Sequence, residues 1–164
     1  MGLEKLRDIP IFNKYTLTYT SNINIASFFK SISSWFSTRG YDFWETGIGE
    51  KDIGTGGLVD SDWKAIKEVT DYVQFELVIK VWIRDLRKVT LENGEETYWG
   101  RIYIRMDSIM HKDYKKRFDN NKKMQELMRQ LYERYIAKEE VDSYMDKLYF
   151  EASDLIDLFR SKMS

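Results

Sequence analysis

The fold is decided by residues 73–84, which read VQFELVIKVWIR. Apolar and polar side chains alternate along this stretch, and a period of two residues is that of a β-strand with one buried face. Four polar positions, Gln74, Glu76, Lys80 and Arg84, exclude a membrane span. The stretch therefore predicts a strand of an antiparallel sheet whose core face carries Val73, Phe75, Leu77, Ile79, Val81 and Ile83.

A hairpin is expected after this strand, at Asn93-Gly94. This dipeptide favours a two-residue type I′ loop, because both of its residues tolerate positive φ. That loop fixes a register in which Ile83 faces Ile104 and Val81 faces Met106 on the core face. On the other face the register gives favourable pairs: Trp82 with Arg105, Arg84 with Tyr103, Lys88 with Trp99, and Lys80 with Asp107. Asp85 would fall on the core face opposite Ile102, which indicates a bulge or the margin of the core.

Three further strands and an amphipathic helix are expected before this hairpin. Residues 15–20 alternate between apolar residues and threonine, which predicts a strand. Ser21, Asn22 and Asn24 offer N-caps to a helix that Gly40 ends, and its apolar residues recur at helical spacing: Ile25, Phe28, Phe29, Ile32, Trp35 and Phe36. Strands over about residues 41–45 and 62–69 flank a glycine-rich segment, residues 47–57, that is expected to be a mobile connection.

The last third of the chain predicts helices. From about residue 119 there is neither Gly nor Pro, and two sets of apolar residues at 3.6-residue spacing are separated by Lys138-Glu139-Glu140. The first set is Met124, Leu127, Met128, Leu131, Tyr132, Tyr135 and Ile136, and the second is Val141, Tyr144, Leu148, Ala152, Leu155, Ile156 and Phe159. They correspond to two helices or to one bent helix.

These elements together predict a single α+β domain over residues 1–164. A strand, a helix and four more strands (residues 1–118) would form an antiparallel sheet of about five strands, packed against the C-terminal helices (residues 119–164).

Composition limits the function further. The chain of 164 residues has 26 basic and 27 acidic residues and a formal charge of −1, which argues against a polyanion binder whose whole surface is basic. A local basic patch is compatible with this balance. The absence of cysteine fits a reducing compartment, and no stretch is apolar enough for a signal peptide or a membrane span. A cytoplasmic location is expected.

No catalytic constellation is recognisable. His111 is the only histidine, so no histidine pair for a metal and no Ser-His-Asp arrangement can form. The run Gly54-Thr55-Gly56-Gly57 lacks the Gly-Lys-Ser/Thr of a phosphate-binding loop and reads as a strand connection. No catalytic residue, metal ligand or cofactor is predicted, and an enzyme that uses His111 or carboxylates is the least favoured alternative.

The outer face of the sheet is the candidate contact surface. The hairpin places rings and guanidinium groups together on it: Trp82, Arg84, Trp99, Arg101, Tyr103 and Arg105. Such a face suits stacking on bases or anchoring a protein partner. The alternative is that these side chains satisfy one another, or that a helix or a second subunit covers them. Trp63 would join this face through Val78 and Ile109 if the turn at Thr70-Asp71 is tight.

Three segments resemble an uncharacterised family of small archaeal proteins. They are residues 67–75 (KEVTDYVQF), residues 131–136 (LYERYI) and Lys147-Leu148-Tyr149. The resemblance implies one domain with this order of elements and brings no activity. At fold level the order of elements also resembles the helix-grip, or START-like, arrangement, in which a sheet curves around a long C-terminal helix and can enclose an apolar ligand.

Two functions follow as hypotheses. The first is a noncatalytic binding module that holds an apolar small molecule between the sheet and the C-terminal helices. The second is a protein-interaction or dimerisation module, associated with an RNA–protein assembly, that uses the aromatic and basic sheet face. Nucleic acid is the less expected direct partner, because the glycine-aromatic segment of an RNA-recognition motif is absent.

Overall fold

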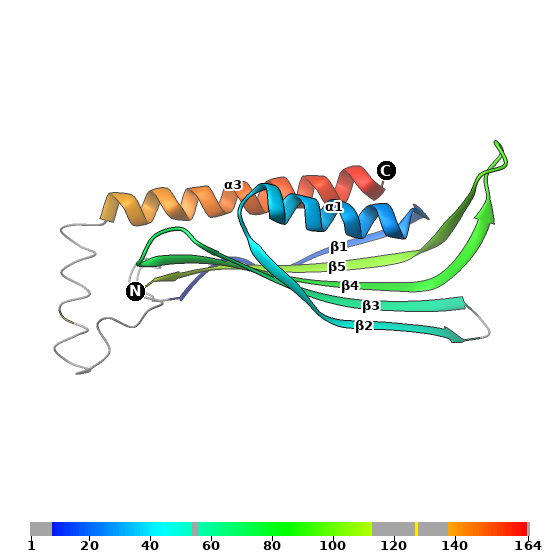
Figure 1. The fold of residues 1–164 in the computed structure, drawn as a ribbon, viewed down its shortest axis with the longest axis horizontal. Helices are drawn as coiled ribbons and strands as arrows, with labels where there is room; N and C mark the ends of the chain where they lie inside the picture. Colours follow the sequence, from blue (N-terminus) through cyan, green and yellow to red (C-terminus); the bar gives the residue numbers. More distant parts are fainter. Residues whose placement is uncertain (1–7, 54–55, 113–126, 128–137, 164) are drawn as a thin grey trace.

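The computed structural model describes residues 8–53, 56–112, 127 and 138–163. Five antiparallel strands form one sheet in the order β1-β5-β4-β3-β2, and two helices lie together on one of its faces (Figure 1). The fold is therefore α+β, as the sequence predicts. The strands are β1 (Asp8–Ile23), β2 (Asp42–Ile53), β3 (Gly56–Glu68), β4 (Val73–Thr90) and β5 (Glu96–Lys112), and the helices are α1 (Ile25–Thr38) and α3 (Lys138–Met163).

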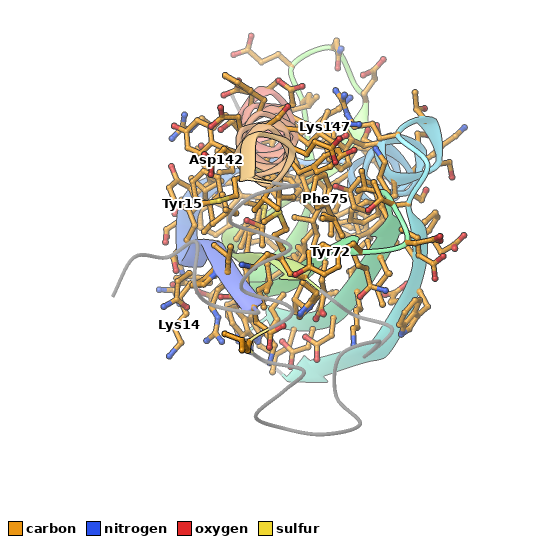
Figure 2. All side chains as sticks on the ribbon, turned by 90° about the vertical axis from the view of Figure 1, so that its left-hand side faces the viewer. Lys14, Tyr15, Tyr72, Phe75, Asp142 and Lys147 are labelled. Carbon is orange, nitrogen blue, oxygen red and sulfur yellow. The ribbon has the colours of Figure 1, made fainter. Side chains whose placement is uncertain are left out.

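The core lies between the helices and the inner face of the sheet. All six apolar residues predicted for that face of β4 are buried. Figure 2, a view turned by 90°, shows the sheet curving around the helices and side chains, Phe75 among them, filling the space between. The alternation along β4 therefore gives the sheet one apolar face, and burial of that face stabilises the fold.

The ends of α1 and the packing of α1 against α3 agree with the sequence. Asn24 is the N-cap of α1, because its side chain accepts a hydrogen bond from the backbone N–H of Ser27 at 3.0 Å. Just after the helix, Gly40 has φ +79°, a conformation that favours glycine. Phe28 of α1 and Phe159 of α3 meet with ring centroids 6.0 Å apart, which joins the helices over the sheet. Of the first predicted C-terminal helix, only Leu127 belongs to the described residues.

The predicted hairpin register is wrong in its partners, although the residues of β4 up to Arg84 and of β5 from Arg101 keep their predicted faces. The loop has three residues, since the N–H of Leu91 bonds the carbonyl of Glu95 at 2.8 Å and Gly94 supplies the positive φ. That loop moves the pairing by one residue, and a bulge between Arg84 and Arg87 moves it by another. As a result Ile83 lies opposite Ile102.

The bulge was expected from the sequence, because the predicted register placed the charged Asp85 on the core face. Asp85 has φ 55°, which is unusual for a residue other than glycine. Gly100 lies beside it on β5, where an added Cβ would come within 3.2 Å of the backbone oxygen of Arg84. The missing side chain at residue 100 is therefore what lets β5 approach the bulge.

The predicted place of Trp63 on the outer face is wrong. The turn before β4 is longer than the tight Thr70-Asp71 turn, because the Thr70 hydroxyl accepts hydrogen bonds from the N–H groups of Tyr72 and Val73. Trp63 consequently lies opposite Ile79 instead of Val78, and a slip of one residue moves a side chain to the other face of a sheet. Its ring is buried, with its centroid 6.0 Å from that of Phe29.

The glycine-rich segment is mostly strand rather than a mobile connection. β2 continues to Ile53 and β3 begins at Gly56, so that Gly47 pairs with Asp62 and Gly49 with Asp60. Gly54 and Thr55 lie outside the described residues. Small residues are compatible with a strand, and backbone pairing along the β2–β3 hairpin offsets their low strand preference.

Neither of the two described helices is long and apolar enough to cross a membrane.

Candidate functional site

Six residues on the outer face of the sheet form the candidate site, and we call them the platform. They are Lys80, Trp82 and Arg84 of β4 and Arg101, Tyr103 and Arg105 of β5. This face points away from α1 and α3 (Figure 1), and no element within the described residues lies over it. Five of the six are residues that the sequence singled out, and Lys80 joins them through the observed register.

The platform has three rows of directly opposed residues. Trp82 lies opposite Tyr103 in the middle row, Lys80 opposite Arg105 in the second, and Arg84 opposite Arg101 in the third. The predicted register paired Trp82 with Arg105, Arg84 with Tyr103 and Lys80 with Asp107. In the observed register two rows of like charge flank a pair of rings instead.

Acidic neighbours partly offset these four cations. Arg84 Nη1 lies 2.7 Å from Asp60 Oδ1, and Arg101 forms an ion pair with Asp85. Arg105 Nε is 3.8 Å from Asp107 Oδ2, beyond hydrogen-bond distance, and this buried nitrogen has no hydrogen-bond partner among the described residues. Lys80 makes no ion pair with any residue the structure describes. The platform therefore holds two well-paired and two weakly paired cations.

Aromatic side chains extend the face at both ends. Trp99, beyond the bulge, lies opposite Arg87 rather than Lys88, with the guanidinium carbon 4.5 Å from the ring centroid. Trp44 of β2 is 43% exposed, and Lys64 lies 5.9 Å above its ring. Trp44 was not among the predicted contact residues, although its alternation with Phe43 in a predicted strand was the available signal.

His111 ties three strands together at the far end of the same face. Its Nδ1 lies 2.7 Å from Asp8 Oδ1 of β1 and its Nε2 2.7 Å from Glu76 Oε2 of β4. The hydrogen bond to Glu76 raises the pKa of His111, and the same bond lowers the pKa of Glu76. Both contacts favour the imidazolium form, which can donate from both nitrogens.

A metal site is not formed by this cluster, because the two carboxylates sit on opposite sides of the ring. More generally, no group of three metal-ligating side chains occurs within the part of the chain that the structure describes. Both ring nitrogens of His111 are engaged by carboxylates, so the ring connects β5 with β1 and β4.

A second polar cluster fastens α3 to the rest of the fold. Glu151 is 9% exposed and accepts hydrogen bonds from Tyr41 Oη at 2.7 Å and Lys67 Nζ at 2.9 Å. Burial raises the pKa of Tyr41, and the nearby Glu151 carboxylate raises it further, so the phenol stays protonated as a donor. The cluster connects α3 with β3 and with the segment between α1 and β2.

No family model, curated protein or solved structure matches this chain. The functional argument therefore rests on the chemistry of its own surfaces.

Proposed function

We propose that this chain is a noncatalytic binding module whose contact surface is the outer face of the sheet, centred on the platform. The observation that carries the proposal is the observed register, in which the Trp82–Tyr103 pair lies between two rows of cations. Rings and guanidinium groups are the side chains that dominate binding energy at contact surfaces. The platform offers them without a nucleophile and base, so we propose binding rather than catalysis.

Stability of the fold does not account for this arrangement. Like charges directly opposite one another destabilise a pair of strands, and the outer face carries two such rows, one on each side of the Trp82–Tyr103 pair. The inner faces of β4 and β5 already supply the buried apolar surface that holds the sheet. A local cost without a structural benefit is expected where a surface serves binding.

An apolar small molecule between the sheet and α3 is the second candidate. The curvature of the sheet around the helices favours it (Figure 2). Aromatic side chains of the helices occupy this space, as the Phe28–Phe159 contact shows, and Leu77, Ile79 and Leu148 are fully buried there. For that reason we rank it second. A cytoplasmic location is part of the proposal and is supported by the absence of cysteine.

Comparative purification tests the proposal. The chain and its Trp82→Leu/Tyr103→Leu variant are expressed in the same cells, purified gently and compared by native mass spectrometry. The matched control is Tyr149→Leu/Phe150→Leu, which removes two exposed rings from α3. We expect a macromolecular partner that stays with the wild type and the control but is lost from the platform variant. A small-molecule adduct that survives in all three proteins would contradict the proposal and support the second candidate.

A further inference from the structure

We infer that the partner of the platform is a single-stranded nucleic acid, whose phosphates contact the four cations and whose bases stack on Trp82 and Tyr103. This inference rests on the proposed function of the same face. It depends on the observed register. In the register predicted from the sequence, Arg84 and Arg105 would have paired with rings and Lys80 with an acid of the neighbouring strand, which would leave them less available to phosphates.

The positions of the cations suit a chain of phosphates. Lys80 and Arg84 are separated by four residues of β4, and Arg101 and Arg105 by four residues of β5. At about 3.4 Å per residue, the two like-charged rows lie about 14 Å apart with the rings between them. A polyanion that runs along the strands therefore meets two cations, then two rings, then two cations.

Four carboxylates accompany the four cations: Asp60 and Asp85 form ion pairs with Arg84 and Arg101, Asp62 of β3 lies opposite Lys80, and Asp107 lies beside Arg105. A phosphate must compete with these carboxylates for the cations. The carboxylate of Asp60 is 54% exposed and that of Asp85 is 35% exposed, and exposed ion pairs contribute little stability. Phosphate oxygens accept short, charge-assisted hydrogen bonds from a guanidinium group, often two at once. Arg105 is suited to this role because its side chain is 33% exposed and its nearest carboxylate, that of Asp107, lies 3.8 Å away, beyond hydrogen-bond distance.

The rings distinguish a single strand from a duplex. Bases in a duplex stack on one another, whereas an unpaired base can stack on an aromatic side chain. Trp82 and Tyr103 are half-buried and lie side by side on an open face, so they can receive unpaired bases but cannot enter a groove. A protein partner of the same face is the competing outcome.

Fluorescence anisotropy with labelled probes tests the inference. The probes are oligouridine and oligothymidine of about 12 nucleotides and a duplex of the same length. Salt is varied from about 50 to 200 mM, and the slope of log affinity against log salt is expected to be about −2 to −3, or −0.7 for each of three to four phosphates. The single strands should bind at least about tenfold more tightly than the duplex.

Variants separate the roles of the rings and the cations. Trp82→Leu/Tyr103→Leu should weaken binding by about tenfold or more with an unchanged slope, because stacking is lost while phosphate contacts persist. Arg101→Gln/Arg105→Gln should make the slope shallower by about 1.4. The control Lys30→Gln/Lys147→Gln removes the same charge from exposed positions on the helices and should bind like the wild type.

Each result decides the inference. Arg101→Glu serves as a second variant if the ring variant unfolds, because the Arg101 side chain is 49% exposed and reversal of its charge should abolish binding at the higher salt. No binding at low salt, duplex affinity equal to that of the single strands, or platform variants that bind like the wild type would overturn the inference. If the oligonucleotides fail while the platform variant still loses a co-purifying protein, the nucleic-acid inference fails and the proposed function stands.

Discussion

At the scale of single residues, His111 shows how one ionised side chain can hold several strands. Its two ring nitrogens bond carboxylates from β1 and β4, and both bonds require protons on the ring. Lys64 Nζ, 3.9 Å from Glu76 Oε1, is the other charge next to this cluster. The stabilisation from this cluster should therefore fall both when His111 loses its proton and when Glu76 gains one.

The sign of the response follows from the two pKa directions. The raised pKa of His111 means that its stabilisation is complete below about pH 6.5 and is lost as pH rises through the folded-state pKa. The lowered pKa of Glu76 means that its stabilisation is present above about pH 4.5 and is lost as pH falls through the folded-state pKa. Both contributions are present together between about pH 4.5 and 6.5.

His111→Gln should therefore cost more stability in weak acid than in alkali. We expect a loss of about 1–2 kcal/mol in the free energy of unfolding at about pH 5.5, and a smaller loss at about pH 9.5, because the stabilisation by the charged ring falls as pH rises through its folded-state pKa. Urea unfolding of both proteins at the two pH values measures the difference. A loss that grows with pH would show that the neutral ring, not the imidazolium, is the stabilising form.

At the scale of elements, the sequence predicts faces more reliably than partners. Alternation assigns Ile79, Val81 and Ile83 to the core, and the observed shift of two residues in their pairing with β5 leaves their face unchanged. The partners depend on loop length and on the bulge at Asp85, and neither can be read from the preference of Asn93-Gly94 alone. Five of the six platform residues were thus predicted to share one face, but their pairing was not predicted.

Trp63 shows the opposite case, where a small error changes the face. The expected turn at Thr70-Asp71 differs from the observed one by a single residue, which moves Trp63 from the outer face to the core. Its indole donates a hydrogen bond to the buried Ser61 hydroxyl at 2.8 Å. The hydrogen bonds that the Thr70 hydroxyl accepts from backbone N–H groups set this turn. The alternation of apolar and polar residues does not predict such side-chain-to-backbone hydrogen bonds.

The attachment of α3 can be tested by a double-mutant cycle on Lys67 and Glu151. Lys67→Met should cost about 3 kcal/mol or more, because it leaves a buried carboxylate without its cation. Adding Glu151→Leu should recover part of that loss, since an apolar pair needs no compensation. Free energies of unfolding for the four proteins give the coupling, and costs that simply add would show that the two groups are not paired in solution.

At the scale of the whole molecule, the placement of both helices on one face leaves the other face of the described sheet for binding (Figure 1). The inner face is closed by packing, and the outer face carries the platform, the exposed Trp44 and the His111 tie. The proposed binding function therefore requires that the outer face is open in solution.

Thiol accessibility measures that openness most directly, because the chain has no cysteine of its own. Single variants Thr18→Cys and Lys80→Cys place a thiol on the outer face beside Tyr103 and within the platform, and Ala65→Cys places one on the fully buried inner face. We predict that both outer-face thiols react with a soluble thiol reagent at close to the rate in the unfolded chain, and that the Ala65→Cys thiol reacts at least about a hundredfold more slowly. Outer-face thiols as slow as the buried one would mean that this face is covered, and would contradict its role as the contact surface.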